Sequence, residues 1–176
     1  MKLTCGLDAD AQIVCHGTEL AQGAPEGRFL DVSPYDDGMV CAVNDQGEFG
    51  CWSDALGWQD DGWATAEMPT GTWMALGTDV SGATLIDSHG DVWRWVSHQS
   101  ARRVLAANGD PYVSSQSRGS SGCALRETGA VDCWGEWEGL EPESRFKQIS
   151  LGCGVTVDGA IECWDDSGAP AVLEVP

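Results

Sequence analysis

The sequence is poor in basic residues. Its 176 residues include 9 Lys and Arg but 28 Asp and Glu, and the formal net charge at pH 7 is −19. A surface with this excess of negative charge repels phosphate backbones, so we expect no nucleic-acid partner. Twelve acids and no base lie between Phe29 and Trp93, whereas seven bases and seven acids lie between Arg94 and Lys147. The first of these sectors is therefore strongly acidic and the second roughly neutral.

Long apolar runs are also missing. No stretch approaches the roughly 20 apolar residues that a membrane helix needs, so we expect no membrane insertion. Residues 1–10, MKLTCGLDAD, contain one Lys but no apolar core of a signal peptide. We interpret the chain as a mature or excised domain of an exported protein. A cytosolic origin with reduced cysteines is the alternative.

Signs of a metal site or of histidine catalysis are scarce. The three histidines lack the paired spacing of metal ligands, and the cysteines form no short Cys-x2-4-Cys knuckle. The Asp-Asp-Gly triplets at residues 36–38 and 60–62 place four carboxylates at one rim, where they could hold calcium or a cationic partner. They lack EF-hand spacing, and ordinary turn chemistry is the interpretation that we favour. We predict no metal, no cofactor and no enzymatic activity. A glycosidase would need two carboxylates facing a central tunnel, for which Asp31 and Glu174 are candidates.

What the sequence does contain is a repeated β-hairpin, seen best at residues 122–135, GCALRETGAVDCWG. Cys123 begins a short apolar run, a polar stretch ends at Gly129, and a β-rich pattern resumes at Val131. A three-residue loop with Gly129 in the left-handed region places Cys123 opposite Cys133. Cβ atoms of such cross-strand pairs are about 4.5 to 5.5 Å apart, which a disulfide can bridge with modest adjustment.

All eight cysteines fit this register, because the two members of each pair are ten residues apart. Free core thiols and a zinc site are the alternatives to disulfides. Four hairpin disulfides indicate an oxidising compartment: extracellular, periplasmic or cell surface. The predicted disulfides join Cys5 with Cys15, Cys41 with Cys51, Cys123 with Cys133, and Cys153 with Cys163.

Five copies of the hairpin begin at residues 5, 41, 84, 123 and 153, so the periods are 36, 43, 39 and 30 residues. The third copy keeps the frame but has Thr84 and Arg94 where the others have cysteines. A period in this range indicates a solenoid, a propeller or an array. The length fits one domain over residues 1–176, with an all-β fold. A tryptophan that recurs after the second cysteine position is expected in the core between repeats: Trp52, Trp95, Trp134 and Trp164.

A further β-strand signal precedes four of the hairpins, at residues 28–33, 72–77, 111–113 and 145–150. The first hairpin has no such strand before it, but residues 172–175 form a spare apolar strand after the last hairpin. We therefore predict a β-propeller of five short blades, closed by pairing the C-terminal strand with the first blade. The alternative is that residues 171–176 form the outer strand of the last blade.

The repeat unit is aromatic-x-x-aliphatic-Ser, then Cys-Ala-Leu, a Gly turn, and aliphatic-x-Cys-Trp-Gly. It resembles the repeat of the regulator of chromosome condensation family, and is similar to the short-repeat bacterial branch that includes β-lactamase inhibitory protein II. The resemblance spans nearly the whole chain and implies a propeller. Members known have seven blades, and the family's frequent Gly-x-x-His before the cysteine is absent here. The inhibitory protein implies binding to a protein partner.

Candidate binding residues lie in the variable connections, where no repeat rule demands a tryptophan. Variable loops on a rigid scaffold commonly carry binding, and Trp is favoured at interface hot spots. Packing on outer strands is the alternative role for these tryptophans. The connection after the second hairpin is the longest and lies in the acidic sector, which suits a partner with a basic surface. The predicted binding residues are Trp58, Trp63, Asp60, Asp61 and Trp137.

The sequence is compatible with two functions. The first is a non-catalytic extracellular module that binds a protein. The second is a lectin-like propeller, since Trp and Asp suit stacking on a sugar ring and hydrogen bonding to it. A lectin should place similar residues in every blade, yet Trp58, Trp63 and Asp60 have no counterparts in the other repeats. The asymmetry favours a protein partner over carbohydrate.

Overall fold

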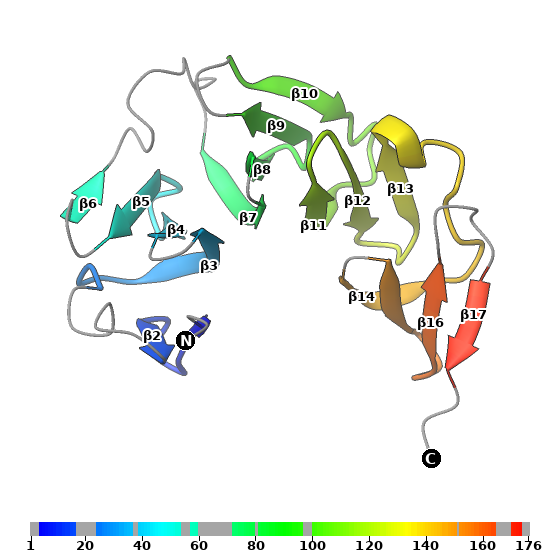
Figure 1. Cartoon of the computed structure of the whole chain (residues 1–176), viewed down its shortest axis with the longest axis horizontal. Helices are drawn as coiled ribbons and strands as arrows, with labels where there is room; N and C mark the ends of the chain where they lie inside the picture. The colour runs from blue at the N-terminus through cyan, green and yellow to red at the C-terminus, as the bar shows by residue number, and fades with distance from the viewer. Residues whose placement is uncertain are drawn as a thin grey trace.

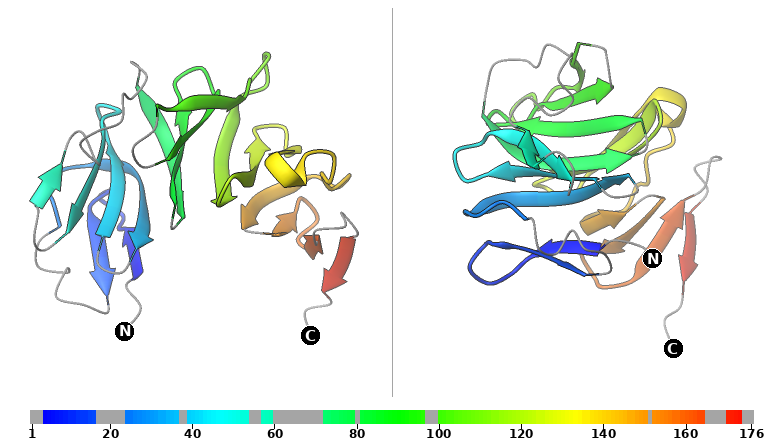
Figure 2. Two further views of the ribbon diagram at one scale, coloured as in Figure 1. Left: turned by 45° about the horizontal axis from the view of Figure 1, so that its top comes forward. Right: turned by 60° about the vertical axis from the view of Figure 1, so that its left-hand side comes forward.

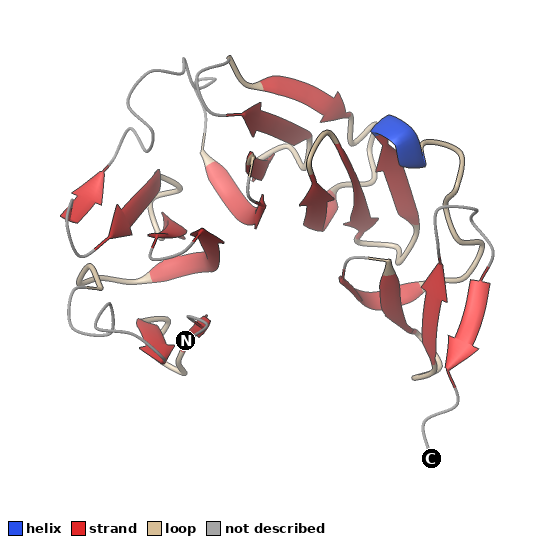
Figure 3. Cartoon of the chain, viewed as in Figure 1, coloured by secondary structure: helices blue, strands red, loops and turns tan. Residues whose placement is uncertain are grey.

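The computed structural model describes residues 4–16, 24–36, 39–53, 57–59, 72–79, 81–96, 100–150, 152–164 and 170–173. Strands dominate the described chain, together with one short 3-10 helix (Figure 3). The elements are β1 Thr4–Leu7, β2 Ile13–His16, β3 Phe29–Asp36, β4 Met39–Asn44, β5 Phe49–Ser53, β6 Gly57–Gln59, β7 Trp73–Asp79, β8 Gly82–Asp87, β9 Val92–Val96, β10 Arg102–Leu105, β11 Tyr112–Arg118, β12 Ser121–Arg126, β13 Val131–Trp134, η2 Gly135–Trp137, β14 Phe146–Ser150, β15 Cys153–Thr156, β16 Ile161–Trp164 and β17 Pro170–Leu173.

The described strands form five antiparallel sheets, which we call blades 1 to 5 in chain order: β1-β2, β3-β4-β5-β6, β7-β8-β9-β10, β11-β12-β13 and β14-β15-β16-β17. The blades stand side by side along an arc (Figure 1). In blades 2 to 5 the first strand borders the concave side of the arc, and we call β3, β7, β11 and β14 the inner strands. Figure 1 and the left-hand view of Figure 2 place the first and last blades at opposite ends of the arc.

The hairpin register is the one that the sequence predicted. Each cysteine stands directly opposite its partner, and the structure contains all four predicted disulfides, with Cα atoms 3.9 to 4.1 Å apart. Thr84 stands opposite Arg94 in the same register. The turn glycine adopts the left-handed conformation, with a φ of +85° at Gly129, and Ala11 takes the same place in blade 1 with a φ of +61°. Local turn geometry therefore determines which cysteines meet.

The strands expected before the hairpins are also confirmed, and they are the inner strands. Each begins with an aromatic residue whose side chain packs back against the preceding blade. Phe29, for example, is buried with Ile13 and Cys15 of blade 1. The recurrent tryptophans occupy the same boundaries, since Trp52 joins this cluster and Trp164 packs edge to face on Phe146. Each pair of neighbouring blades thus shares its own apolar core.

Backbone hydrogen bonds repeat at every boundary between blades. The N–H of the leading aromatic donates to the carbonyl of the preceding turn: Phe29 to Ala11 at 2.8 Å, Trp73 to Gly47 at 2.9 Å, Tyr112 to Gly90 at 3.1 Å and Phe146 to Gly129 at 2.8 Å. Because the next strand lies directly against the turn, the turn residue must lack a side chain as well as adopt the left-handed conformation. A Cβ atom on Gly90 would lie 2.3 Å from the Cβ atom of Pro111.

The predicted closure by the C-terminal strand is wrong. β17 pairs with β16 in register Glu162 to Val172 and Cys163 to Ala171, so it is the fourth strand of blade 5. When β17 pairs with its own hairpin, only a short loop has to close. Pairing with blade 1 would close a loop as long as the whole chain and would cost more conformational entropy. The local edge is therefore filled.

Candidate functional site

Most of the predicted binding residues lie outside the described residues. Trp63, Asp60 and Asp61 belong to residues 60–71, which the structure does not describe. The backbone of Trp58 lies in β6, opposite Trp52. This pairing places residue 58 on the fourth strand of blade 2, at the convex side of the arc (Figure 1). The binding role of these residues stays a prediction.

Trp137 lies in η2, which follows the last strand of blade 4. Its side chain is partly buried and packs against the cluster that blades 4 and 5 share, with Cys133 and Phe146 among its members. A packed tryptophan of this kind stabilises the boundary between blades. Trp137 thus has a packing contact, and its predicted binding role remains a prediction.

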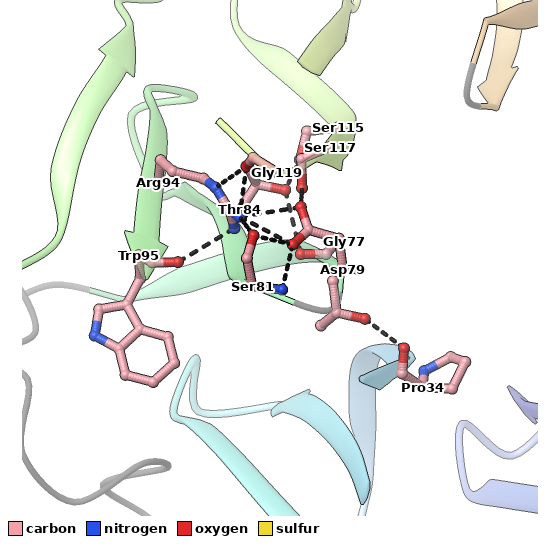
Figure 4. Close-up of polar contacts among 11 residues, drawn as sticks. Pro34, Gly77, Asp79, Ser81, Thr84, Arg94, Trp95, Ser115, Ser117 and Gly119 are labelled. Carbon is pink, nitrogen blue, oxygen red and sulfur yellow. Dashed lines mark hydrogen bonds and ion pairs between the residues drawn. The ribbon is translucent and has the colours of Figure 1, made fainter. Parts of the chain in front are cut away.

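Blade 3 replaces the missing disulfide with a buried ion pair (Figure 4). The Arg94 side chain is 1% exposed, and its Nη2 atom donates to both carboxylate oxygens of Asp79 at 3.0 Å. The same guanidinium donates to Ser81 Oγ at 2.8 Å and to the carbonyl of Gly119 at 2.8 Å. Because Gly119 belongs to blade 4, Arg94 ties two blades together. Sequence reasoning missed this partner, although an Arg in a cysteine position was the signal.

Burial and the hydrogen-bonding partners oppose each other at both members of this pair, and the net effect lowers both pKa values. Burial alone would raise the pKa of Asp79, but hydrogen bonds from Ser81 and Ser117 and the charge of Arg94 bring it below its ordinary value. Burial lowers the pKa of Arg94, and Asp79 opposes that change. A carboxylate with a lowered pKa beside a guanidinium stays ionised, so the group is a structural pair and a poor proton donor or acceptor.

Side-chain hydrogen bonds also join the inner strands to the neighbouring blade. Asp31 of β3 accepts from the N–H of Leu76 in β7 at 2.9 Å, and Ser33 and Thr78 share a hydrogen bond of 2.8 Å. Ser117 of β11 donates to Asp79 at 2.7 Å. Burial raises the pKa of Asp31, and its backbone hydrogen bonds offset only part of that rise. The inner strands of blades 2 to 4 therefore lie side by side in a defined register.

A row of exposed side chains follows the inner strands, one in each of blades 2 to 5. We call Leu30, Met74, Val113 and Lys147 the inner-strand row. Each comes directly after the leading aromatic, at a β-bulge where the register with the second strand shifts. Three members are large apolar side chains that are 42%, 52% and 48% exposed, and Lys147 is exposed as well. Sequence reasoning missed the row because a bulge inverts the simple alternation of faces.

An open hollow of about 510 Å³ lies at the start of this row. Its lining includes Glu26, Arg28, Phe29 and Asp45, from the link before β3 and the turn after β4. The turn of blade 1 is adjacent, since Phe29 donates to Ala11, and that turn exposes Asp8 and Asp10. Four exposed acids and one base thus gather around this end of the row.

The described residues offer no group of three or more His, Cys, Asp and Glu side chains that could hold a metal ion. Within the same residues, no helix has the length and apolar character needed to cross a membrane.

Comparison with known proteins shows likeness at the level of structure. No family model matches the sequence, and no curated protein matches it. Solved structures do match, among them human WBSCR16, with a TM-score of 0.66 and 12% identity over 99% of this chain. Yeast RCC1 (Prp20), solved bound to Kap60, matches with a TM-score of 0.63 and 14% identity over 91% of this chain. The fold is that of a β-propeller.

This finding confirms the all-β propeller predicted from the repeat, and the predicted number of blades stays a prediction. A third match is the CRINKLY WD40 ectodomain of the Arabidopsis thaliana receptor kinase ACR4, with a TM-score of 0.64 and 21% identity over 98% of this chain. The chain spans 65%, 53% and 65% of the lengths of the WBSCR16, Prp20 and ACR4 chains, respectively. Identities this low show a shared fold.

Proposed function

We propose that this propeller is a non-catalytic extracellular module that binds a protein partner with a basic surface. The observation that carries the proposal is the acidic hollow beside blade 2. It opens where Glu26, Arg28 and Asp45 are exposed, so acids outnumber bases in its lining, at the edge of the sector from Phe29 to Trp93 that contains no Lys or Arg. A negative field of this kind steers a basic partner and raises its association rate.

The disulfides and the solved propellers support the two other parts of the proposal. Four hairpin disulfides suit an oxidising compartment, which includes the extracellular space, the periplasm and the cell surface. Among the matched structures, yeast RCC1 was solved bound to Kap60, so a protein that contains this fold occurs in a complex with another protein. We place the contacts of this chain in its variable connections, centred on Trp58 and Trp63.

A screen of the purified chain against secreted and cell-surface proteins, with a glycan array in parallel, tests the proposed function. We expect a protein ligand whose association slows as salt is added. Replacing Trp58 and Trp63 with Ala should speed dissociation, whereas Asp60→Asn with Asp61→Asn should slow association and flatten its salt dependence. The matched control is Asp158→Asn, an exposed turn acid of blade 5. Glycan binding through several equivalent blades would replace this proposal with a lectin.

A further inference from the structure

The link between β10 and β11 contains an Asn-Gly dipeptide at residues 108 and 109. The sequence has two asparagines, Asn44 and Asn108, and only the second is followed by glycine. In such a dipeptide the backbone nitrogen of the glycine can attack the side-chain amide carbon of the asparagine, because a residue without a Cβ atom does not crowd the ring that forms. Asparagine is among the thermolabile residues of proteins. The surroundings of each asparagine decide whether the fold permits the attack.

The two asparagines have different surroundings. The side-chain nitrogen of Asn44 donates to Glu48 Oε2 at 2.6 Å, and the side-chain oxygen of Asn44 accepts from the N–H groups of Gln46 and Glu48 at 3.1 and 2.8 Å. Asn108 is exposed, and its side chain makes no hydrogen bond with any residue that the structure describes. The amide of Asn44 is therefore held by its own turn, whereas that of Asn108 can rotate toward the backbone.

The attacking group is also unobstructed. Gly109 is exposed, and a Cβ atom at this position would meet nothing within 4 Å. The N–H of Gly109 donates to no acceptor among the described residues. Asn108 and Gly109 both have positive φ, at +50° and +92°, which is the conformation that an Asn-Gly turn favours. The nucleophile and its target thus lie together at an open turn, residues 107–110, which we call the Asn-Gly turn.

The Asn-Gly turn joins blades 3 and 4. The N–H of Ala107 donates to Asp91 Oδ1 of blade 3 at 2.7 Å. Arg126 of blade 4 donates from Nη1 to the carbonyls of Ala107 and Asp110, at 2.9 and 2.6 Å. The N–H of Asp110 also donates to the carbonyl of Ala107 at 3.0 Å, which closes the turn. A change in the backbone between residues 107 and 110 therefore reaches both blades.

Arg126 extends this contact to the core between the two blades. It donates from Nε to Asp132 Oδ2 at 2.5 Å and from Nη2 to the hydroxyl of Tyr112 at 2.6 Å. The Cζ atom of Arg126 lies 4.2 Å from the centroid of the Tyr112 ring. Tyr112 is the leading aromatic of blade 4 and packs with Ile86 and Val92 of blade 3. The Asn-Gly turn thus helps to fix the guanidinium that holds the aromatic residue at this boundary.

We propose that Asn108 is a modification site, at which slow deamidation converts the residue to isoaspartate and aspartate and loosens the boundary between blades 3 and 4. The nitrogen of Gly109 gives its proton to solvent base and bonds to the side-chain carbonyl carbon of Asn108. The bond from that carbon to the amide nitrogen breaks, ammonia leaves, and a cyclic imide remains. Water then opens the imide at either of its carbonyls. The net reaction consumes water, releases ammonia and needs no oxidant or reductant.

The two products differ in their effect on the turn. Aspartate adds a negative charge and keeps the backbone path, whereas isoaspartate also inserts a methylene carbon into the main chain. With a longer path from Ala107 to Asp110, Arg126 loses the fixed pair of carbonyls to which Nη1 donates. Isoaspartate should therefore release the turn, and aspartate should leave most of it in place. This inference is independent of the proposed function, because no partner takes part in the reaction.

Peptide mapping of aged protein tests the site. Folded protein and protein unfolded in urea are kept in the same mildly alkaline buffer, sampled at intervals, reduced and digested with trypsin. The peptide of residues 104–118 carries Asn108, since cleavage follows Arg103 and Arg118. Mass spectrometry measures the replacement of the amide NH2 by OH, and electron-transfer fragmentation distinguishes isoaspartate from aspartate. Asn44 in the same digest is the internal control.

We expect Asn108 to convert in the folded protein at a rate within a few-fold of its rate in the unfolded chain, while folding slows the conversion of Asn44 strongly. The variant Asn108→Gly accepts the positive φ and should form no acidic species at this turn. Protection of Asn108 by folding as strong as that of Asn44 overturns the inference.

Hydrogen exchange of the separated forms tests the effect on the boundary. The N–H groups of Ala107 and Asp110 are both hydrogen-bonded, and they should exchange several-fold faster in the isoaspartate form than in fresh protein. The matched control is Asn108→Asp, which has the charge without the inserted carbon and should exchange at nearly the rate of fresh protein. Equal exchange in the isoaspartate form and in fresh protein overturns the proposed loosening of the boundary.

Discussion

At the residue scale, the most informative position is Arg94, where a disulfide has been exchanged for charge. A buried ion pair contributes little net stability compared with an apolar pair of the same shape, because both charges lose their hydration. Here Ser81, Ser117 and Gly119 complete the hydrogen bonding of the pair. The exchange also gives blade 3 a contact that a hairpin disulfide does not supply, because Arg94 reaches the neighbouring blade.

Breaking the pair should therefore be costly. We expect Asp79→Asn to lower the free energy of unfolding by about 3 kcal/mol, because the Arg94 charge stays buried without its counter-ion. Urea denaturation monitored by tryptophan fluorescence measures this loss. The control is Asp45→Asn at an exposed turn, for which a change within about 0.5 kcal/mol is expected. Equal costs for the two variants would show that the pair is not important for stability.

Two half-buried carboxyl groups, those of Asp79 and Asp31, should make stability depend on pH in opposite ways. The folded-state pKa of Asp79 is lowered, so its contribution is full above the ordinary carboxyl pKa and is lost as pH falls through the folded value. The folded-state pKa of Asp31 is raised, so its contribution is full in acid and is lost as pH rises through the folded value.

Denaturation midpoints of three proteins, measured from about pH 3 to pH 7, check this sign difference. The deficit of Asp79→Asn relative to wild type should shrink as the pH falls. The stability of Asp31→Asn relative to wild type should increase as the pH rises. Asn keeps an oxygen that accepts from the N–H of Leu76 but has no charge to bury. Parallel curves for all three proteins would contradict both assignments.

At the scale of the element, the turn glycine serves two purposes. Its left-handed backbone closes the hairpin, and its missing side chain lets the next blade approach. Gly90 and Gly159 allow these two purposes to be tested separately. Both residues have a positive φ, at +79° and +92°. A Cβ atom on Gly90 would meet Pro111, whereas one on Gly159 would meet nothing within 4 Å.

We expect Gly159→Ala to cost about 1 to 2 kcal/mol, the price of the left-handed conformation for a residue with a Cβ atom. Gly90→Ala should cost clearly more, since it must also displace the strand that begins at Tyr112. Thermal unfolding of the two variants makes the comparison. A Gly90→Ala variant as stable as Gly159→Ala would show that the boundary between blades adapts at little cost.

The elements also show where sequence reasoning succeeds and where it stops. The inner strands were predictable because an aromatic residue and a following hairpin recur in one frame, with an aliphatic three residues after the aromatic in three of the four strands. β17 was predicted as a strand, but its partner was not, because an apolar strand has no local feature that selects one edge over another. Bulges, and with them the exposure of Leu30, Met74 and Val113, depend on pairing that no single strand specifies.

At the scale of the whole molecule, each blade is completed by the next. The face of a hairpin that carries the disulfide is covered by the aromatic and the tryptophan of the following blade. Val43 of blade 2 is 0% exposed for this reason, while the equivalent Val155 of blade 5 is only partly buried. None of the described residues forms a further blade over Val155.

The same substitution in these two places should therefore differ in cost. We expect Val43→Ala to lower the free energy of unfolding by about 2 kcal/mol, through lost burial and the cavity that remains. Val155→Ala should cost less than half as much, because less of the side chain is removed from water. Urea midpoints of the two variants test the comparison. Equal costs would mean that the face of blade 5 is as well covered as that of blade 2.

The sequence by itself determined the hairpins, their register and the disulfides, because these depend on residues at most ten positions apart and on one left-handed turn residue. Only the tertiary structure decided that Arg94 pairs with Asp79 and reaches Gly119, that Trp137 packs between blades 4 and 5, and that the arc stays open with β17 on β16. The physical reason is distance along the chain. Asp31 meets Leu76 across 45 positions, and Ser117 meets Asp79 across 38. Contacts of that separation are set by how whole blades stack, which no local pattern encodes.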